Sequence, residues 1–314
     1  MDYILGVDGG GTKTTVLVTD IKGSSIAESE SGSSNYKSVG IEVARENISK
    51  AMLEAIEKMN SVEKFTFKGA CFGISGNDFS EDRKIYHKII FAGKIKDYLN
   101  PSRTIICNDT RIGLAAGSDS KNGIMIISGT GSNCYGINEK GKEAKVNGLD
   151  YILADEGSGY EIGLKALKAL IRAYDGRGES TLLLKTILED LKIKNVMELV
   201  KWAHSGLFFK EKIAAIAKTV CRTAKMKDRV SIRILKEEAE EAFLSIETVA
   251  EKLNLMEKEF DLVFVGSVFK CEKYFKSVVM KNLKDKFPKI NLMPLTKKPV
   301  EGAIKLALKL CNSL

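Results

Sequence analysis

Several residue types that would point to other classes of protein are scarce in this chain. The 314 residues include 2 histidines, 4 prolines and 1 tryptophan. Because His87 and His204 lie far apart in the sequence, we expect no histidine-rich zinc site. No run of about 18 apolar residues occurs, so we expect no membrane-spanning helix. The first residues lack the basic segment of a secretory signal peptide, so we expect no cleaved leader.

Cysteine is present, but its spacing forms no pairs. None of the six cysteines belongs to a Cys-x-x-Cys pattern, and most of them lie in apolar runs. A thiol in such a run packs as a small hydrophobic side chain. The pattern predicts free thiols and a cytoplasmic protein, since the cytoplasm keeps thiols reduced.

The chain is basic, with a net charge of +8, but its charge is dispersed. The densest group of lysines, over residues 281–298, is mixed with apolar residues. We therefore expect a solvated surface, no nucleic-acid partner and no membrane partner. A mild positive field suits anionic substrates such as nucleotides.

Length and hydrophobic pattern predict two α/β domains. The region from 157 to about 260 is mostly helical in pattern, whereas the segments on either side carry strand patterns. The expected strands are 3–7, 14–20, 67–75, 103–107, 123–128, 134–137, 261–265 and 290–293. The expected flanking helices are 41–59 and 300–310.

Two segments repeat the same arrangement of strand, glycine-and-hydroxyl loop and strand. They are Val7–Thr14 and Ile127–Cys134, which begin about 120 residues apart. The repeat predicts a duplicated unit with one such loop in each half. Two loops of this kind facing each other would hold a polyphosphate between two domains.

The first loop has the composition of a phosphate-binding loop. Gly10 and Gly11 follow another glycine and allow close backbone approach, while Thr12, Lys13 and Thr14 add hydroxyls and a positive charge. Thr12 breaks the Walker pattern, and a strand rather than a helix follows, which argues against a dinucleotide fingerprint. A plain hairpin turn is the alternative.

Asp8 ends the apolar strand that leads into this loop. A carboxylate beside phosphates can hold Mg²⁺, commonly through water. The alternative is that Asp8 only shapes the turn.

Asp109 follows the expected strand 103–107 and precedes a helical pattern. The end of a strand is where α/β proteins place reacting groups. Its carboxylate could accept the proton of a hydroxyl nucleophile during phosphoryl transfer. Asn108, Asp109 and Thr110 also form a good helix cap, and the sequence favours neither role over the other.

Three further segments are candidates for binding a polar ligand. The second loop, Ser128–Asn133, repeats the glycines and hydroxyls of the first loop. Asp155 and Ser158 stand in an acidic, glycine-containing stretch before a helix, where capping is the alternative. Asn35 offers both a donor and an acceptor, with a turn residue as the alternative.

These motifs, in this order, resemble one family across nearly the whole chain. It is the N-acetylglucosamine kinase branch of the BadF/BadG/BcrA/BcrD ATPases, within the superfamily of sugar kinases and actin. The matching segments are 6–15, Asn35 with Gly40, Asn108 with Asp109, 127–134, 155–159, the adenosine motif 263–269 and the closing helix at 299–303.

The resemblance implies two ribonuclease-H-like domains, 1–115 with 297–314 and 116–296, with a cleft between them. It implies ATP and Mg²⁺ as cofactors, an N-acetylated amino sugar as substrate, and a homodimer. Asp109 would be the general base on the sugar 6-hydroxyl. The implied nucleotide contacts are Asp8, Gly10, Gly11, Thr12, Lys13, Thr14, Gly129, Thr130, Gly131, Gly266 and Ser267. The implied sugar contacts are Asn35, Asn108, Asp109, Ser128, Asn133, Asp155 and Ser158.

The sequence departs from the family at the expected sugar pocket. Relatives usually carry Gly-Gly-Trp-Gly where this chain has 147–150, Asn-Gly-Leu-Asp. Loss of the tryptophan would leave room for a 3-O substituent such as the lactyl ether of N-acetylmuramate. We therefore expect N-acetylglucosamine, N-acetylmuramate or both as substrates, in amino-sugar or cell-wall sugar salvage.

Another protein class shares the same ATPase core. Activators of 2-hydroxyacyl-CoA dehydratases hold an iron–sulfur cluster between two subunits and need a cysteine just before the second loop. This chain has Ile126, Ile127 and Ser128 there, and Cys134 lies after the loop. The activator is the alternative function.

Overall fold

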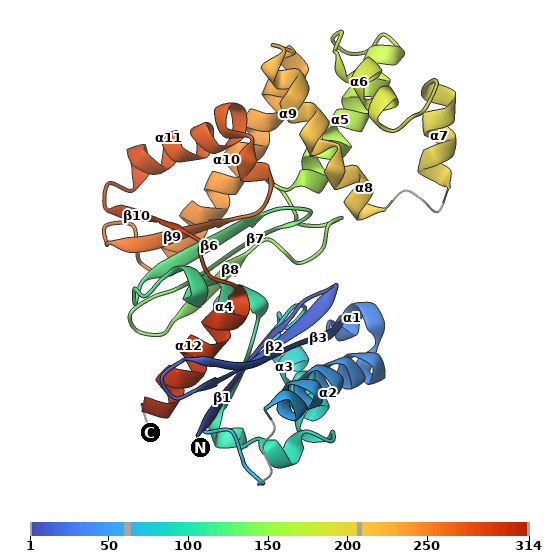
Figure 1. Cartoon of the computed structure of the whole chain (residues 1–314). Helices are drawn as coiled ribbons and strands as arrows, with labels where there is room; N and C mark the ends of the chain where they lie inside the picture. Colours follow the sequence, from blue (N-terminus) through green and yellow to red (C-terminus); the bar gives the residue numbers. More distant parts are fainter. Residues whose placement is uncertain (1, 60–63, 206–208, 313–314) are drawn as a thin grey trace. The chain divides into compact units, whose positions relative to one another are not determined.

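The computed structural model describes residues 2–59, 64–205 and 209–312. The chain divides into two compact units. The first unit comprises Met1–Asp119 and Pro294–Leu314, and the second comprises Ser120–Met293. Each unit consists of one five-stranded sheet with helices packed on it (Figure 1). In the part of the chain that the structure describes, no helix has the length and hydropathy needed to cross a membrane.

The first unit is built on a five-stranded sheet with the order β3-β2-β1-β4-β5. Strand β1 pairs antiparallel with β2 and parallel with β4. The strands are β1 (Tyr3–Gly9), β2 (Lys13–Asp20), β3 (Ser25–Gly32), β4 (Gly69–Ile74) and β5 (Thr104–Cys107). The α-helices are α1 (Tyr36–Val39), α2 (Ile41–Lys58), α3 (Ser80–Phe91), α4 (Asp109–Gly117) and α12 (Pro299–Asn312).

Alternating residues of these strands enter two separate cores, because successive side chains of a strand point to opposite faces. Leu5 and Val7 of β1 pack with α2 and α3, whereas Ile4 packs with α4 and α12. Figure 1 accordingly shows α2 and α3 on one side of this sheet and α12 on the other. Both faces are covered, which explains the continuous burial of the central strands.

The second unit repeats the topology of the first. Its sheet has the order β10-β9-β6-β7-β8, in which β6 pairs antiparallel with β7 and parallel with β9. Read from its other edge, this sheet has the order β8-β7-β6-β9-β10, which corresponds strand by strand to β3-β2-β1-β4-β5 of the first unit. The strands are β6 (Gly123–Ser128), β7 (Ser132–Ile137), β8 (Glu143–Val146), β9 (Phe260–Val265) and β10 (Ile290–Pro294). The expected α/β class with two domains is confirmed.

Helices of the second unit form one large core against this sheet. The long helix α10 lies along the sheet, and α5 to α9 extend from its end (Figure 1). The helices are α5 (Gly159–Tyr174), α6 (Leu183–Asp190), α7 (Val196–His204), α8 (Lys210–Ala215), α9 (Ala217–Lys225), α10 (Arg229–Lys252) and α11 (Ser277–Lys286). A 3₁₀ turn (Val268–Lys270) and a π-helical turn (Glu272–Lys276) connect β9 to α11.

Candidate functional site

The first glycine-rich loop is the tip of the β1–β2 hairpin. The N–H of Gly10 donates to the carbonyl of Lys13 at 2.8 Å and closes the turn. Gly11, Thr12 and Lys13 are exposed, so their backbone N–H groups can reach a ligand. The Lys13 ammonium pairs with Glu30 on β3 at 2.5 Å, which holds this cation beside the loop. The structure thus shows the hairpin turn, and phosphate binding by its exposed tip stays a prediction.

Thr14 differs from its neighbours in the loop. Its side chain is buried, and its hydroxyl donates to the carbonyl of Gly32 at 2.8 Å. The Thr14 hydroxyl therefore holds β2 against β3, and its expected contact with the nucleotide stays a prediction. Gly9 is also tightly enclosed, since a Cβ there would overlap the hydroxyl of Ser34. The hairpin is therefore packed against the segment that leads to Asn35.

Asp8 and Asp109 form the acidic part of the first unit. The pKa of the Asp8 carboxyl is raised to about 6, chiefly by burial and then by the negative charge of Asp109, while Lys13 opposes both effects. Asp8 stands near the end of β1, and Asp109 begins the helix that follows β5. Two strand ends of one sheet thus present interacting carboxylates, an arrangement suited to a cation or a proton transfer.

The helix cap at α4 is supplied by Asn108. Its side-chain oxygen accepts from the N–H of Thr110 at 3.0 Å, and its amide nitrogen donates to Asp78 at 3.1 Å. The capping alternative therefore does not require the Asp109 carboxylate. Asn108, expected to contact a sugar, is bonded at both ends and fixes the start of α4.

Asn35 caps the short helix α1, and its side-chain oxygen accepts from the N–H of Lys37 at 3.1 Å. It lies against Gly76, where a Cβ would come within 2.5 Å of that oxygen. The next residue, Asn77, was not singled out from the sequence. Its side-chain nitrogen is buried without a hydrogen-bond partner among the described residues. No motif marks Asn77, because its place beside Asn108 depends on the folded β4–α3 loop.

The second loop joins β6 to β7 and is anchored to helix α5. The N–H groups of Gly159 and Tyr160 donate to the carbonyls of Gly129 and Thr130, at 2.8 and 3.1 Å. These bonds fix the loop to the first turn of α5 and use two of the N–H groups of that turn. The second loop is therefore held in a defined conformation, and phosphate binding by Gly129–Gly131 stays a prediction.

Two serines expected to contact the sugar also support the backbone of this region. Ser128 is buried, and its hydroxyl donates to the carbonyl of Gly157. Ser158 is buried as well, and its oxygen caps α5 by accepting from the N–H of Glu161 at 3.1 Å. Both hydroxyls thus bond to the backbone, at Gly157 and at Glu161, and the expected sugar contacts of the two serines stay predictions.

The same acidic loop is fastened from the side of α10. The N–H of Gly157 donates to the buried Glu238 carboxylate at 2.6 Å, and Lys165 pairs with Glu238 at 2.7 Å. Asn147, from the segment that departs from the family, donates to the carbonyl of Glu156 at 3.2 Å. The loop carrying Asp155 is therefore rigidly placed.

Asp155 is 5 % exposed and pairs with Lys210 of α8, with 2.7 Å between Oδ2 and Nζ. Nearby, the side-chain oxygen of Asn133 is buried and has no hydrogen-bond partner in the described part of the chain. Both are expected sugar contacts, and the unpartnered oxygen of Asn133 is suited to a hydroxyl or amide donor. Lys210 was missed, because nothing in the sequence relates it to Asp155.

A cavity of about 470 Å³ lies in the second unit beside the second loop. Gly129, Thr130 and Ser267 line it together with residues of α8 and α9, such as Lys218. Gly266 has φ +112°, and a Cβ there would overlap the carbonyl oxygen of Ser128. The expected adenosine segment and the expected phosphate loop thus meet at one cavity of nucleotide size.

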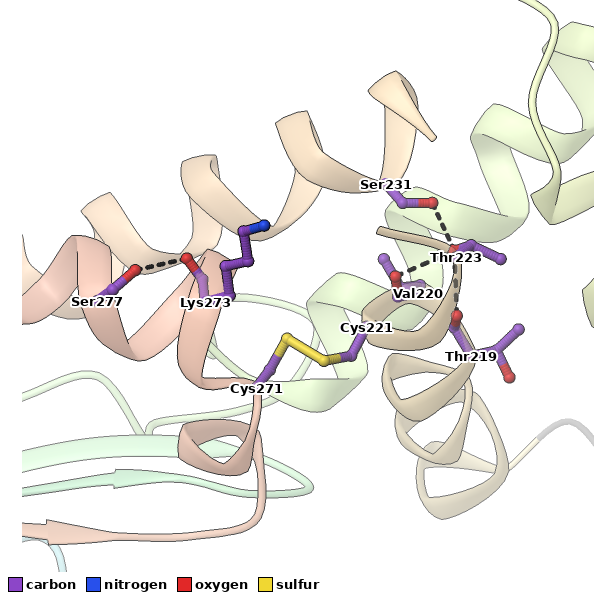
Figure 2. Close-up of a disulfide and its surroundings, with 8 residues drawn as sticks. All are labelled: Thr219, Val220, Cys221, Thr223, Ser231, Cys271, Lys273 and Ser277. Atoms are coloured by element: carbon purple, nitrogen blue, oxygen red, sulfur yellow. Dashed lines mark hydrogen bonds between the residues drawn. A yellow bond between two sulfur atoms is a disulfide. The ribbon is translucent and has the colours of Figure 1, made fainter. Parts of the chain in front are cut away.

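One wall of this cavity contains a disulfide. Cys221 of α9 is bonded to Cys271, which follows the 3₁₀ turn after β9 (Figure 2). The expectation of free thiols is therefore wrong for these two cysteines. They lie 50 residues apart in the sequence, and the folded second unit brings them together.

The comparisons with known proteins agree with this arrangement. The family model described as "BadF/BadG/BcrA/BcrD ATPase family" matches residues 5–307. An N-acetylmuramic acid/N-acetylglucosamine kinase of Clostridium acetobutylicum is 35 % identical over 99 % of this chain and 100 % of its own. An N-acetyl-D-glucosamine kinase of Dictyostelium discoideum is 30 % identical over 98 % of each chain.

A solved structure shares the fold. It is that of a candidate N-acetylglucosamine kinase from Chromobacterium violaceum, with a TM-score of 0.73 and 18 % identity, covering 98 % of this chain and 99 % of the other. The family match over most of the chain and the full-length similarity to curated relatives lead to one assignment. The chain belongs to the BadF/BadG/BcrA/BcrD ATPase family.

Proposed function

We propose that this protein transfers the γ-phosphoryl group of ATP to the 6-hydroxyl of an N-acetylated amino sugar, N-acetylglucosamine, N-acetylmuramate or both. The chain is an ATP-dependent sugar kinase. The observation that carries the proposal is the full-length similarity to two kinases named for these sugars. The expected pathway is the salvage of amino sugars or cell-wall sugars.

The second unit supplies the proposed nucleotide site. Its 470 Å³ cavity would hold adenosine beside Ser267, and the N–H groups of Thr130 and Gly131 would bind phosphate oxygens. The N–H of Gly129 closes the loop by donating to the carbonyl of Gly131 at 2.9 Å. In the first unit, the exposed N–H groups of Gly11 and Thr12 and the Lys13 ammonium would bind the remaining phosphates. Backbone donors fixed in place need little reorganisation as charge develops on the transferring group.

Asp109 is the proposed general base. It would accept the proton of the sugar 6-hydroxyl while the oxygen forms a bond to the γ-phosphorus and the bond to ADP breaks. Asn35, Asn133 and Asp155 would orient the sugar. The fixed start of α4, capped by Asn108, holds the Asp109 backbone in a defined position.

Mg²⁺ fits the surroundings of Asp8. The Asp109 carboxylate raises the pKa of Asp8, and two carboxylates that interact in this way favour a hard cation with oxygen ligands. Asp8 would hold the ion through water. When bound, Mg²⁺ neutralises charge on the phosphates during transfer.

The decisive assay measures ADP release with Mg·ATP in the presence of N-acetylglucosamine, N-acetylmuramate, N-acetylmannosamine, glucosamine or glucose. We expect turnover that depends on one or two of the N-acetyl sugars. Asp109→Asn should lower kcat by about 10²- to 10⁴-fold and leave ATP binding nearly unchanged. ADP release that ignores every sugar would contradict the kinase, and normal turnover by Asp109→Asn would remove this residue from the mechanism.

No observation favours the activator of a 2-hydroxyacyl-CoA dehydratase. Cys134, the cysteine nearest the second loop, lies in β7 and is fully buried, and burial raises the pKa of its thiol far above the usual value. A thiol of this kind is a poor ligand for a cluster at a surface.

We also propose a cytoplasmic location, where ATP is available, and a homodimer, which light scattering would measure.

A further inference from the structure

The structure places a lysine at the proposed sugar site that the kinase reaction itself does not require. Lys210 begins helix α8, and its ammonium pairs with the buried Asp155 at 2.7 Å. The same ammonium lies 5.2 Å from the centre of the Tyr151 ring. Its side chain is 27 % exposed, whereas that of Asp155 is 4 % exposed. The cation therefore lies between a buried carboxylate and solvent.

Among the described residues, the Lys210 ammonium has a single hydrogen-bond acceptor. A lysine carries three N–H groups, and its hydrogen bond to Asp155 uses one of them. The ring face of Tyr151 attracts the positive charge without accepting a full hydrogen bond. A glycine at position 131 keeps the second loop close, because a Cβ there would lie 3.0 Å from the ammonium. An anionic group of a ligand on the solvent side would find an unused donor here.

The neighbouring surface is apolar. The segment that replaces the family's Gly-Gly-Trp-Gly begins with a left-handed turn at Asn147 and Gly148, with φ of 63° and 68°. The chain then exposes Leu149, Tyr151, Ile152 and Leu153, the last two at 73 % and 78 %. Tyr151 is held by edge-to-face packing on Tyr160. A cation thus adjoins an exposed apolar segment.

We propose that Lys210 recognises the carboxylate of a 3-O-lactyl substituent, and so selects N-acetylmuramate over N-acetylglucosamine. The inference rests on the proposed amino-sugar kinase and deepens it. Without Lys210, the Asp155 carboxylate would repel a second carboxylate, whereas the ion pair presents a cation outward. The lactyl methyl group finds apolar neighbours in the exposed segment.

A purely structural Lys210 makes a different prediction. If the lysine only held Asp155 in place, its removal would weaken both sugars equally, since both need Asp155. If Lys210 recognises the carboxylate, its removal changes the ratio of kcat/KM for N-acetylmuramate to kcat/KM for N-acetylglucosamine. Charge-assisted hydrogen bonds of this kind correspond to about a 10- to 100-fold change in binding.

The test compares kcat/KM for N-acetylmuramate, its neutral carboxamide and N-acetylglucosamine. In wild type, we expect the carboxamide to be about 10- to 100-fold poorer than the acid. Lys210→Met should remove that difference and lower the ratio of N-acetylmuramate to N-acetylglucosamine by a similar factor. Lys210→Arg should largely retain the ratio. Lys212→Met, which changes an exposed lysine of the same helix, is the matched control and should leave the ratio unchanged.

Each contrary outcome is identifiable. Equal losses on both sugars in Lys210→Met would reduce Lys210 to a support for Asp155 and overturn the inference. Wild-type turnover of N-acetylglucosamine without turnover of N-acetylmuramate would overturn it while leaving the kinase intact. Absence of any sugar-dependent turnover in wild type would overturn the proposed function and, with it, this inference. The wild-type comparison of acid and carboxamide needs no variant, so a folding defect cannot obscure the result.

Discussion

Asp8 and Asp109 show how two ordinary carboxylates acquire unusual chemistry from their positions. They belong to elements that are far apart in sequence, and parallel pairing of β1, β4 and β5 brings those elements to one edge of a sheet. Each carboxylate then makes ionisation of the other more costly. A cation or a proton relieves this repulsion, and a phosphoryl-transfer site requires both.

The raised pKa of Asp8 predicts an acid limit to activity. Because its pKa is about 6, Asp8 is charged above that pH and becomes protonated as the pH falls through it. We expect kcat/KM to fall below about pH 6, and excess Mg²⁺ to move the fall to lower pH by favouring the charged form. Asp8→Asn should lower kcat/KM by about 10- to 100-fold and abolish the fall in kcat/KM below pH 6. If the pH profile of that variant were unchanged, the fall in kcat/KM would belong to another titrating group.

At the level of elements, Asp82 ties together the start of α3 and helix α1. Its carboxylate accepts from the N–H groups of Asp78 and Phe79, each at 2.9 Å, from the hydroxyl of Tyr36 at 2.5 Å, and from the Lys37 ammonium at 2.9 Å. Burial alone would raise the pKa of Asp82, but these donors outweigh it and lower the pKa to about 2.

This lowered pKa makes stability depend on acid pH. A depressed pKa contributes stability that is present above the unfolded value of about 4 and is lost as the pH falls toward 2. Asp82→Asn should therefore lower the free energy of unfolding by about 1 to 2 kcal/mol at pH 7, and by less at pH 3. Urea unfolding of both proteins at pH 7 and at pH 3 measures this difference in the free energy of unfolding. Glu81→Gln, an exposed neighbour in the same helical turn, is the control, and an equal loss at both pH values would contradict the linkage.

The disulfide between Cys221 and Cys271 is expected to stabilise the second unit. Closing a loop of this length typically contributes about 2 to 4 kcal/mol to the free energy of unfolding. Cys221→Ser, Cys271→Ser and wild type with reductant should lose the same amount, without additivity. The KM for ATP should rise in all three, because both cysteines line the 470 Å³ cavity. Cys311→Ser is the control. Untreated, denatured wild type should show four titratable thiols, and six would contradict the bond.

The sequence predicts some of these elements far better than others. Strands β1, β4, β6 and β9 follow from unbroken apolar runs, since both sheet faces are covered. Strand β3 was missed because it lies at a sheet edge, where only Ala27 and Ser29 are buried and no apolar alternation arises. The cap at Asn108 and the loop glycines follow from local chemistry. The Lys210–Asp155 pair and the Cys221–Cys271 bond join residues 50 or more apart, and no local pattern encodes such contacts.

At the scale of the whole chain, the last helix completes the first unit. The chain leaves this unit after Asp119 and returns at Pro294, and α12 then packs on β1 and α4. These two elements carry Asp8 and Asp109. A Cβ at Gly6 of β1 would lie 2.8 Å from the carbonyl oxygen of Val300, so α12 is in close contact with the strand. Residues near the C-terminus thus position both carboxylates of the proposed site.

Gly302 tests this dependence. A Cβ at this position would overlap the carbonyl oxygen of Ile112 and lie 2.7 Å from the N–H nitrogen of Ala116, both backbone atoms of α4. Because backbone cannot rotate aside, Gly302→Ala must separate α12 from α4, at a cost of about 3 kcal/mol. We expect the melting temperature to fall by about 6 to 12 °C. Activity should fall further than the unfolded fraction explains, since α4 carries Asp109.

The matched control is Gly93→Ala in the same unit, where a Cβ would meet its nearest neighbour at 3.5 Å, an ordinary contact. That variant should keep both the stability and the activity of wild type. If Gly302→Ala melted as Gly93→Ala does, the close approach of α12 to α4 would be absent in solution. If Gly302→Ala were destabilised but kept full kcat at low temperature, α12 would stabilise the fold without positioning Asp109. Only a combined loss supports a C-terminal helix that holds the catalytic carboxylate in place.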